Sequence, residues 1–403
     1  MAPILQLLLA LFIILVAAKG AGYLSTRLGQ PSVLGELLIG LILGPTVLNM
    51  LGWPFFGDPH LGETIRHLAE IGVLILMFIA GLEVDLEAMV RAVLAGVIGV
   101  IAPILLGGLQ GWLSGFDLAH SAFIGLTLAA TSVSISAQTL MELQVLRTRV
   151  GMGLLGAAVV DDVLVVLLLS VFMGVAAGSS SLLSVLWVLA RMVIFLVLAI
   201  WLGGKILPRL GALVERLPIS EGVMALALAI TFLYAWAAEA LGGMAAITGA
   251  FIAGLIFGRS PLREEIEHGM HTLAYAWLVP VFFVSIGLET NARSLGISGI
   301  PFALAMVVVA VLSKVIGCGL GARLGGFTNG EALRLGVGMS SRGEVGLIVA
   351  TVGMSSGLID DLVFASVVIM VLVTTLLTPI MLRALYPRPA GGPQPQPAAE
   401  IDQ

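Results

Sequence analysis

Cysteine and charge are both scarce in this chain. Its 403 residues include one cysteine, Cys318, and only 11% charged residues, whereas soluble domains carry about twice that share of charge. A single cysteine excludes an intrachain disulfide and a cysteine-based metal site. Histidine is also scarce inside the apolar segments, which argues against a buried transition-metal site. The five histidines fall at or near predicted loops: His60, His67, His120, His268 and His271.

Apolar residues fill most of the remaining sequence. They make up 59% of the chain, and the mean hydropathy is +1.12. Long apolar runs recur along nearly the whole length, as in proteins that cross a membrane many times. The runs do not alternate between apolar and polar residues, so they do not fit a β-barrel. The composition therefore predicts an all-α polytopic membrane protein.

Gly, Pro and charged residues divide the apolar runs into thirteen predicted membrane spans. The spans cover roughly residues 3–28, 33–51, 64–82, 88–113, 118–143, 149–177, 182–206, 219–240, 243–259, 267–288, 300–323, 330–356 and 362–386. Residues 387–403 are rich in Pro, Gln and Ala and predict a disordered tail.

The basic residues predict how the spans are oriented. With the N-terminus outside, every basic residue between spans lies on the cytoplasmic side except Arg66 and Arg293. Cytoplasmic loops of membrane proteins carry an excess of Lys and Arg. This asymmetry supports an odd number of spans and a cytoplasmic C-terminus.

The sequence also repeats itself at a spacing of about seven spans. Residues 78–83 resemble residues 283–289, and residues 40–44 resemble residues 254–258. An odd offset inverts the second copy in the membrane. We therefore expect two inverted six-helix repeats joined by a linker helix, an architecture found in secondary transporters.

Two adjacent acids, Asp161 and Asp162, lie inside the sixth span, where no other charge occurs between residues 150 and 177. Ionised carboxylates cost several kcal/mol or more at the membrane centre, so they are rare there and usually functional. The alternative is a structural pair that holds helices together. Neighbouring positions on a helix point about 100° apart, so the two acids can do different work.

The fifth and twelfth spans are predicted to be broken helices that cross at the site. Hydroxyls crowd residues 130–137, which include Thr131 and Ser132, and can support a break in a helix. Residues 339–346 combine Ser340, Ser341, two glycines and the charged residues Arg342 and Glu344. Interrupted helices at matching places in two repeats indicate a substrate site, and freed carbonyls there favour cations.

Each of these features has a simpler alternative. The hydroxyls of the fifth span could serve helix packing alone, and Glu344 could be a structural partner for Arg342. Lys314 lies well inside the eleventh span and needs a countercharge, for which the acids of span six are the best candidates. The alternative for Lys314 is that it reaches an interface with its long side chain.

Taken in order, residues 30–36, 130–137, 156–162, 313–317 and 342–346 resemble the monovalent cation:proton antiporter-2 superfamily, and specifically its NapA-like sodium/proton antiporters. The resemblance implies a transmembrane antiporter domain over residues 1–386. It implies a scaffold of residues 3–82 and 219–288 that forms a homodimer. It also implies a core of residues 88–177 and 300–386, a linker helix at residues 182–206, and movement of the core against the scaffold.

The resemblance also implies roles for the residues above. Asp161 and Asp162 would bind Na⁺ or protons, with help from Thr131 and Ser132. Lys314 would form a salt bridge that breaks when sodium binds, and we assign Asp162 as its partner and Asp161 as the additional proton carrier. Two acids are similar to the electrogenic branch, which exchanges two protons per sodium ion.

The expected function is therefore exchange of Na⁺ or Li⁺ for H⁺ in a prokaryotic inner membrane, without a cofactor or nucleic-acid partner. A K⁺/H⁺ antiporter of the same superfamily is the main alternative, and a cation channel is another. An enzyme is not expected, because a nucleophile and base set is missing from the predicted spans.

Overall fold

The computed structural model describes residues 2–82, 91–176, 182–291 and 296–386, and these residues form helices and connecting loops without any β-strand. Ten helical stretches are long and apolar enough to cross a membrane, and three shorter apolar helices accompany them. Each of the thirteen predicted ranges contains at least part of one of these helices. The predicted tail, residues 387–403, lies outside the described residues.

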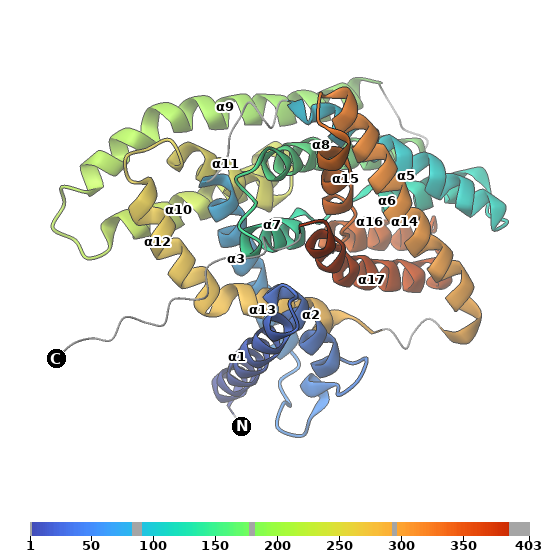
Figure 1. The fold of residues 1–403 in the computed structure, drawn as a ribbon, viewed down its shortest axis with the longest axis horizontal. Helices are drawn as coiled ribbons and strands as arrows, with labels where there is room; N and C mark the ends of the chain where they lie inside the picture. Colours follow the sequence, from blue (N-terminus) through green and yellow to red (C-terminus); the bar gives the residue numbers. More distant parts are fainter. Residues whose placement is uncertain (1, 83–90, 177–181, 292–295, 387–403) are drawn as a thin grey trace.

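The helices pack as two groups, which Figure 1 shows on opposite sides of the molecule. The first group contains α1 (Pro3–Arg27), α2 (Ser32–Leu43), α3 (Leu61–Leu82), α10 (Gly222–Ala237), α11 (Ala246–Phe257), α12 (Arg263–Leu273) and α13 (Val279–Glu289). Two π-helical turns, η2 (Ala238–Gly242) and η3 (Ala274–Leu278), extend α10 and join α12 to α13, and the 3₁₀ turn η1 (Met50–Gly52) follows α2.

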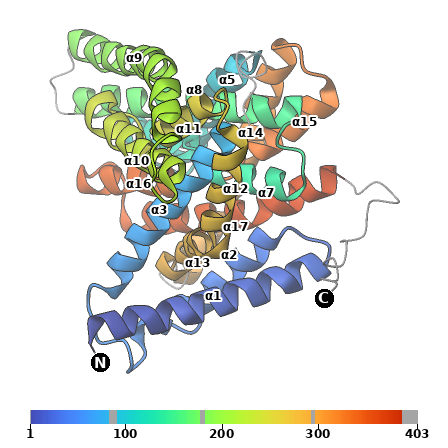
Figure 2. The same cartoon turned by 90° about the vertical axis from the view of Figure 1, so that its left-hand side faces the viewer.

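The second group contains α5 (Val93–Leu113), α6 (Leu118–Ala129), α7 (Val133–Glu142), α8 (Arg149–Ala176), α14 (Gly296–Leu324), α15 (Asn329–Gly338), α16 (Glu344–Ser355) and α17 (Asp361–Leu385). Helix α5 packs against α6, α8 and α14, and α14 packs against α15 and α17. Helix α9 (Leu182–Val214) runs along the edge of the molecule opposite α1, and contacts α8, α10 and α11 (Figures 1 and 2).

Glycines let the helices of the first group touch backbone to backbone. Helix α2 packs on α13, where a Cβ at Gly40 would overlap the carbonyl oxygen of Val284. Helix α11 packs on α3 in the same way, and a Cβ at Gly254 would overlap the carbonyl oxygen of Phe78. Both contacts involve the repeated segments of the sequence. Residues 40–44 pack against residues 283–289, and residues 254–258 pack against residues 78–83.

The helices α6, α15 and α17 begin at loops and carry side-chain caps from their own sequence. The Asp117 side chain accepts a hydrogen bond from the His120 amide at the start of α6, and Asp360 does the same for Val363 in α17. Thr328 and Glu331 form a reciprocal capping box at the start of α15. Such caps satisfy amides that have no partner within the helix. The helix ends inside the molecule lack them, as the site shows.

Candidate functional site

Two helix breaks lie face to face in the second group. The fifth predicted span stops at Ala129 and resumes as α7 at Val133, and the twelfth stops at Gly338 and resumes as α16 at Glu344. The α7 N-cap, Ser132, and the α16 N-cap, Gly343, make no side-chain capping bond. Both broken helices were predicted from sequence, and the described backbone confirms the position of each break.

Direct hydrogen bonds join the two breaks. The Ser132 amide donates to the Ser341 carbonyl oxygen at 3.0 Å, and the Ser136 hydroxyl donates to the Gly338 carbonyl oxygen at 2.5 Å. A Cβ on Gly343 would lie 2.6 Å from the Ser132 side chain, so this contact requires glycine. The free amide ends of α7 and α16 and the carbonyl ends of α6 and α15 are thereby gathered in one buried place.

Asp161 forms an ion pair with Lys314, and both side chains are completely buried. The prediction that Lys314 pairs with an acid of the sixth span is confirmed, but the choice of Asp162 is wrong. The physical reason is the direction of the two side chains, because adjacent residues of α8 point about 100° apart. Asp161 points toward α14, which carries Lys314, whereas Asp162 points toward α11.

Asp162 faces the first helix group. Its Oδ2 atom accepts a hydrogen bond from the Thr248 hydroxyl at 3.2 Å, and Thr248 is the third residue of α11. Both residues line a cavity of about 20 Å³ together with Val133, the residue that follows the first break. A cavity of that size holds about one water-sized particle. Sequence reasoning missed Thr248, because one threonine in an apolar helix gives no signal.

Arg342 is completely buried beside the second break. Its guanidinium donates to the carbonyl oxygens of Ala310 at 2.9 Å and Met339 at 3.3 Å. Its own amide and carbonyl bond to Thr374 and Thr375 of α17. The expected partner was Glu344, whose side chain lies outside the described residues. The bonds that are described make Arg342 a brace between the break, α14 and α17.

The four hydroxyl residues predicted at the breaks are buried, but they differ in their hydrogen bonds. The Thr131 hydroxyl donates to the Ala129 carbonyl oxygen at 3.4 Å, and the Ser132 hydroxyl lies 3.1 Å from that of Ser134. The Ser340 hydroxyl donates to the Val337 carbonyl oxygen. None of these described bonds reaches a carboxylate. The structure therefore brings Thr131 and Ser132 to the break without joining them to either acid.

Several buried polar atoms of the site have no hydrogen-bond partner among the described residues. They are the Oδ2 atom of Asp161, the Oγ atom of Ser341 and the Nε atom of Arg342. Buried polar atoms are usually paired, but among the described residues unpaired ones also occur away from the breaks, at Gln30, Gln110, Arg149 and Tyr386. The unpaired atoms therefore do not by themselves mark the site.

A cavity of about 540 Å³ leads from the molecular surface to the second break. Arg66, Glu70 and Glu289 line it from α3 and α13, and residues of α16 and α17 form the opposite wall. Gly343 lies in its lining and touches Ser132, as described above. The cavity therefore extends to the second break, between the two helix groups.

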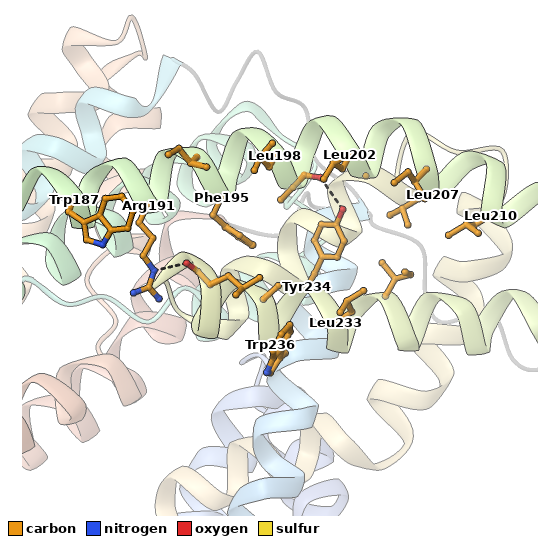
Figure 3. A pocket seen from close by; sticks show the side chains of 17 residues that line it. Trp187, Arg191, Phe195, Leu198, Leu202, Leu207, Leu210, Leu233, Tyr234 and Trp236 are labelled. Carbon is orange, nitrogen blue, oxygen red and sulfur yellow. Dashed lines mark hydrogen bonds between the residues drawn. The ribbon is translucent and has the colours of Figure 1, made fainter.

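Another groove lies elsewhere and is unsuited to ions. It has a volume of about 580 Å³ between α9 and α10, and Figure 3 shows its lining of apolar side chains. Its one basic residue, Arg191, already donates to the Leu241 carbonyl oxygen (Figure 3). Tyr234 donates across the groove to the Ala199 carbonyl oxygen. The groove contains no acid, so the acid pair of α8 remains the candidate site.

The sequence of this chain matches a known protein family. The family described as "Sodium/hydrogen exchanger, transmembrane" matches residues 9–386. The chain belongs to this family. It is accordingly a multi-pass membrane protein of a family of ion antiporters.

Two curated relatives illustrate the match. The chain is 42% identical over 380 residues to the "Na(+)/H(+)-K(+) antiporter GerN" of Bacillus cereus, covering 93% of this chain and 95% of the relative. It is 38% identical over 378 residues to the "Na(+)/H(+) antiporter" of Enterococcus hirae, covering 93% and 96% of the two chains.

A solved structure has the same fold. It is the sodium proton antiporter MjNhaP1 from Methanocaldococcus jannaschii, with a TM-score of 0.70 and 19% sequence identity over 96% of this chain and 98% of that one.

Proposed function

We propose that this protein is a secondary transporter that exchanges Na⁺ or Li⁺ for H⁺ across the membrane. The observation that carries the proposal is the acid pair of α8, with Asp161 facing a buried ammonium and Asp162 facing a small cavity beside a helix break. Protons and a hard monovalent cation compete for the same carboxylate oxygens. Competition for one site is sufficient to couple the two flows.

The proposed binding residues are those at the crossing. Asp161 and Asp162 bind the cation or the protons, and Thr131 and Ser132 supply neutral oxygens from the break. Arg342, Glu344, Ser340 and Ser341 support the second break. The bonds of Arg342 to α14 and α17 favour this supporting role. Transported Na⁺ and H⁺ are substrates, and the proposed mechanism uses no cofactor.

Movement of one helix group against the other provides alternating access. In this proposal the second group, residues 88–177 and 300–386, is the core, and the first group, residues 3–82 and 219–288, is the scaffold, with α9 as linker. The reciprocal packing of α2 on α13 and of α11 on α3 supports two inverted six-helix repeats. In this proposal the core moves when it holds a cation or protons and stays in place when the site is empty.

Charge counting supports electrogenic exchange with two protons per cation. When all are ionised, the two acids and Lys314 leave one net negative charge. One sodium ion brings the site to neutrality, whereas two protons on the acids leave one net positive charge. The two loaded forms therefore differ by one elementary charge, which the membrane potential would drive with about 2.3 kcal/mol per 100 mV. Lys314 then links charge movement to the ionisation of Asp161.

Potassium is the second candidate substrate. The name of the Bacillus cereus relative includes both Na⁺ and K⁺, which supports testing K⁺ on this chain. Oxygen ligands discriminate between these ions by geometry and number. A channel-like protein of this fold would instead carry cations without proton counterflow.

The wider setting of the transporter is also proposed. We expect a NapA-like homodimer in a prokaryotic inner membrane, with the N-terminus outside, the C-terminus cytoplasmic and all thirteen predicted spans crossing. The distribution of basic residues supports this orientation. Cysteine scanning with an impermeant thiol reagent on either face would test it, since the only native cysteine, Cys318, is buried.

The test uses purified protein in vesicles that contain a pH dye. Addition of Na⁺, Li⁺ or K⁺ in turn should move protons for the transported cations only, and a membrane potential should change the rate. A cation that enters without proton movement would identify a channel. If no monovalent cation moves protons, the antiporter proposal is wrong.

A further inference from the structure

The contact between Thr248 and Asp162 joins the two helix groups at the ion site. Thr248 belongs to α11 in the scaffold, Asp162 to α8 in the core, and the hydroxyl-to-carboxylate distance is 3.2 Å. Both side chains are buried. We propose that Thr248 is a scaffold residue that positions Asp162 and sets cation affinity from one face of the membrane. This inference rests on the proposed exchange function.

The position of Thr248 is held by close packing. The next residue, Gly249, touches the Tyr234 carbonyl oxygen so tightly that a Cβ would overlap it, and Gly254 does the same at Phe78. The hydroxyl therefore meets Asp162 in a fixed place. Thr248 lies in the first turn of α11, so the carboxylate that it contacts is near the electropositive start of this helix. The N-cap Ala245 provides no side-chain cap for the free amides there.

The chemistry of a hydroxyl suits both states of the site. In the empty site its proton stabilises the carboxylate, and when a cation enters the same oxygen can join the carboxylate as a neutral ligand. The cavity beside both groups has room for one such particle. Because Thr248 stays with the scaffold, the moving core takes Asp162 away from it in the other half of the cycle.

Thr248→Val removes the hydroxyl and keeps the shape. We expect the KM for Na⁺ to rise about tenfold, equivalent to the net value of one hydrogen bond to a charged group, from one face of oriented vesicles only, with kcat little changed. Thr248→Ser should restore the KM. The matched control is Thr231→Val, since the buried Thr231 hydroxyl bonds, among the described residues, only to the Ala227 carbonyl oxygen of its own helix.

Equal effects from both faces, or an unchanged KM, would overturn the role of Thr248. Binding provides an independent measurement, since Na⁺ should raise the Tm of the detergent-solubilised wild type more than that of Thr248→Val. If the wild type exchanges no protons but shows this difference in Tm, the proposed function fails while the Thr248 assignment stands. Equal Tm shifts together with normal exchange reject Thr248 alone.

A second, independent observation concerns Glu142, at the far end of α7 from the break. Its carboxylate accepts hydrogen bonds from the Ser32 amide at 2.5 Å, the Ser32 hydroxyl at 2.8 Å and the Val33 amide at 3.1 Å. Helix α2 starts at Ser32 and has no cap of its own. Glu142 of the core therefore caps a scaffold helix. The residues that it caps lie in the segment 30–36, to which the proposed function gives no role.

Neighbouring bonds strengthen the same contact. Gln138, one turn earlier on α7, donates to Glu142 at 2.9 Å and accepts a hydrogen bond from the Tyr275 hydroxyl at 2.9 Å. The Tyr275 carbonyl oxygen in turn accepts from Lys19 of α1 at 2.8 Å. Through Glu142 and Gln138, helix α7, which begins at the first break, is bonded to α2 and η3 of the scaffold.

We infer that Glu142 and the start of α2 form a latch that opens in every transport cycle. The inference rests on the proposed movement of core against scaffold. If α7 moves with Asp161 and Asp162, these charge-assisted bonds to Ser32 and Val33 cannot persist in both states. The latch then holds the present conformation and adds to the barrier for leaving it.

A reversible cross-link tests the latch. In a Cys318→Ala background, Ser32→Cys with Glu142→Cys would be joined by a short bis-methanethiosulfonate reagent. We expect the exchange rate to fall at least about tenfold, because the link prevents the two residues from separating. Such a fall corresponds to about 1.4 kcal/mol of added barrier, and the rate should recover when the link is reduced. The control pair is Thr328→Cys with Glu331→Cys, which share a similar helix cap inside the core. Linking it should leave exchange intact.

Normal exchange by the linked Ser32–Glu142 pair, or failure of that pair to link when the control pair does, would overturn the latch. The contact between Glu142 and α2 can also be tested without a transport measurement. Glu142→Ala should speed hydrogen exchange at the Ser32 and Val33 amides in the resting protein. That result in a protein that moves no protons would separate the failure of the proposed function from that of the latch.

Discussion

Asp161 and Asp162 are neighbours in sequence but occupy different environments. Asp161 is enclosed by the second helix group and paired with Lys314, whereas Asp162 lies at the boundary with the first group, next to a cavity and Thr248. The difference shows that one helical step is enough to separate an acid paired with a buried ammonium from one that faces a cavity. In our proposal Asp162 is therefore the main exchange site and Asp161 sets its electrostatic surroundings.

The largest expected effect comes from Asp162→Asn. The change removes the carboxylate that faces the cavity while keeping its size, so exchange should fall by a factor of about 100 or more, as when a charged group that holds the substrate is lost. Proton movement in dye-loaded vesicles measures it. Asp360→Asn, in a helix cap remote from the site, serves as the control. Normal turnover by Asp162→Asn would show that Asp162 is not the main exchange site.

Asp161→Asn should act mainly on stability. It leaves the Lys314 ammonium buried without its partner, which typically costs about 3–5 kcal/mol. A large decrease in Tm with some remaining exchange would distinguish it from Asp162→Asn. If the two asparagine variants have the same Tm and the same rate, the two acids are equivalent and the comparison fails.

Lys314→Ala sharpens the comparison further. Without the ammonium, the charge moved per cycle should change more than the rate of exchange itself, which current measurements on solid-supported membranes would detect. Stability should fall because Asp161 is left unpaired. The double variant Asp161→Asn with Lys314→Met should recover part of that loss, since neither charge is then buried alone. An unchanged dependence on membrane potential would contradict the role given to Lys314.

The smallest effect is expected at Asp117, an acid outside the spans that provides a baseline. Its hydrogen bonds from the His120 amide and side chain hold the pKa of its carboxyl below the usual value. A lowered pKa adds stability above the unfolded-state value, and this contribution is lost as pH falls through the folded-state value. The Tm of Asp117→Asn should thus approach that of wild type at low pH, with exchange unaffected at neutral pH.

Much of the site follows from local sequence. Charges in an apolar run identified Asp161, Asp162 and Lys314, and hydroxyls and glycines in mid-span located both breaks. The rotation of α8 about its axis could not be predicted, because the sequence sets the angle between adjacent side chains but not which neighbour each one meets. That is why Lys314 was assigned to the wrong acid, and why Thr248 was missed.

The boundaries of the helices were also predicted only in part. The predicted second span, residues 33–51, is a helix only to Leu43, because Gly44 and Pro45 stop it. The predicted linker, residues 182–206, continues as α9 to Val214 and contains Pro208. Helix α9 also packs against α10 and α11, and such tertiary packing is not contained in local propensity.

The backbone contacts at Gly40, Gly254 and Gly287 also bear on how force passes through the protein. Where two helices meet through side chains, rotamer changes can absorb a push, but where main chains touch there is nothing between them to yield. The first helix group is therefore stiff at these crossings. In the proposed transport cycle it would move as one body, and displacement would take place where it meets the second group.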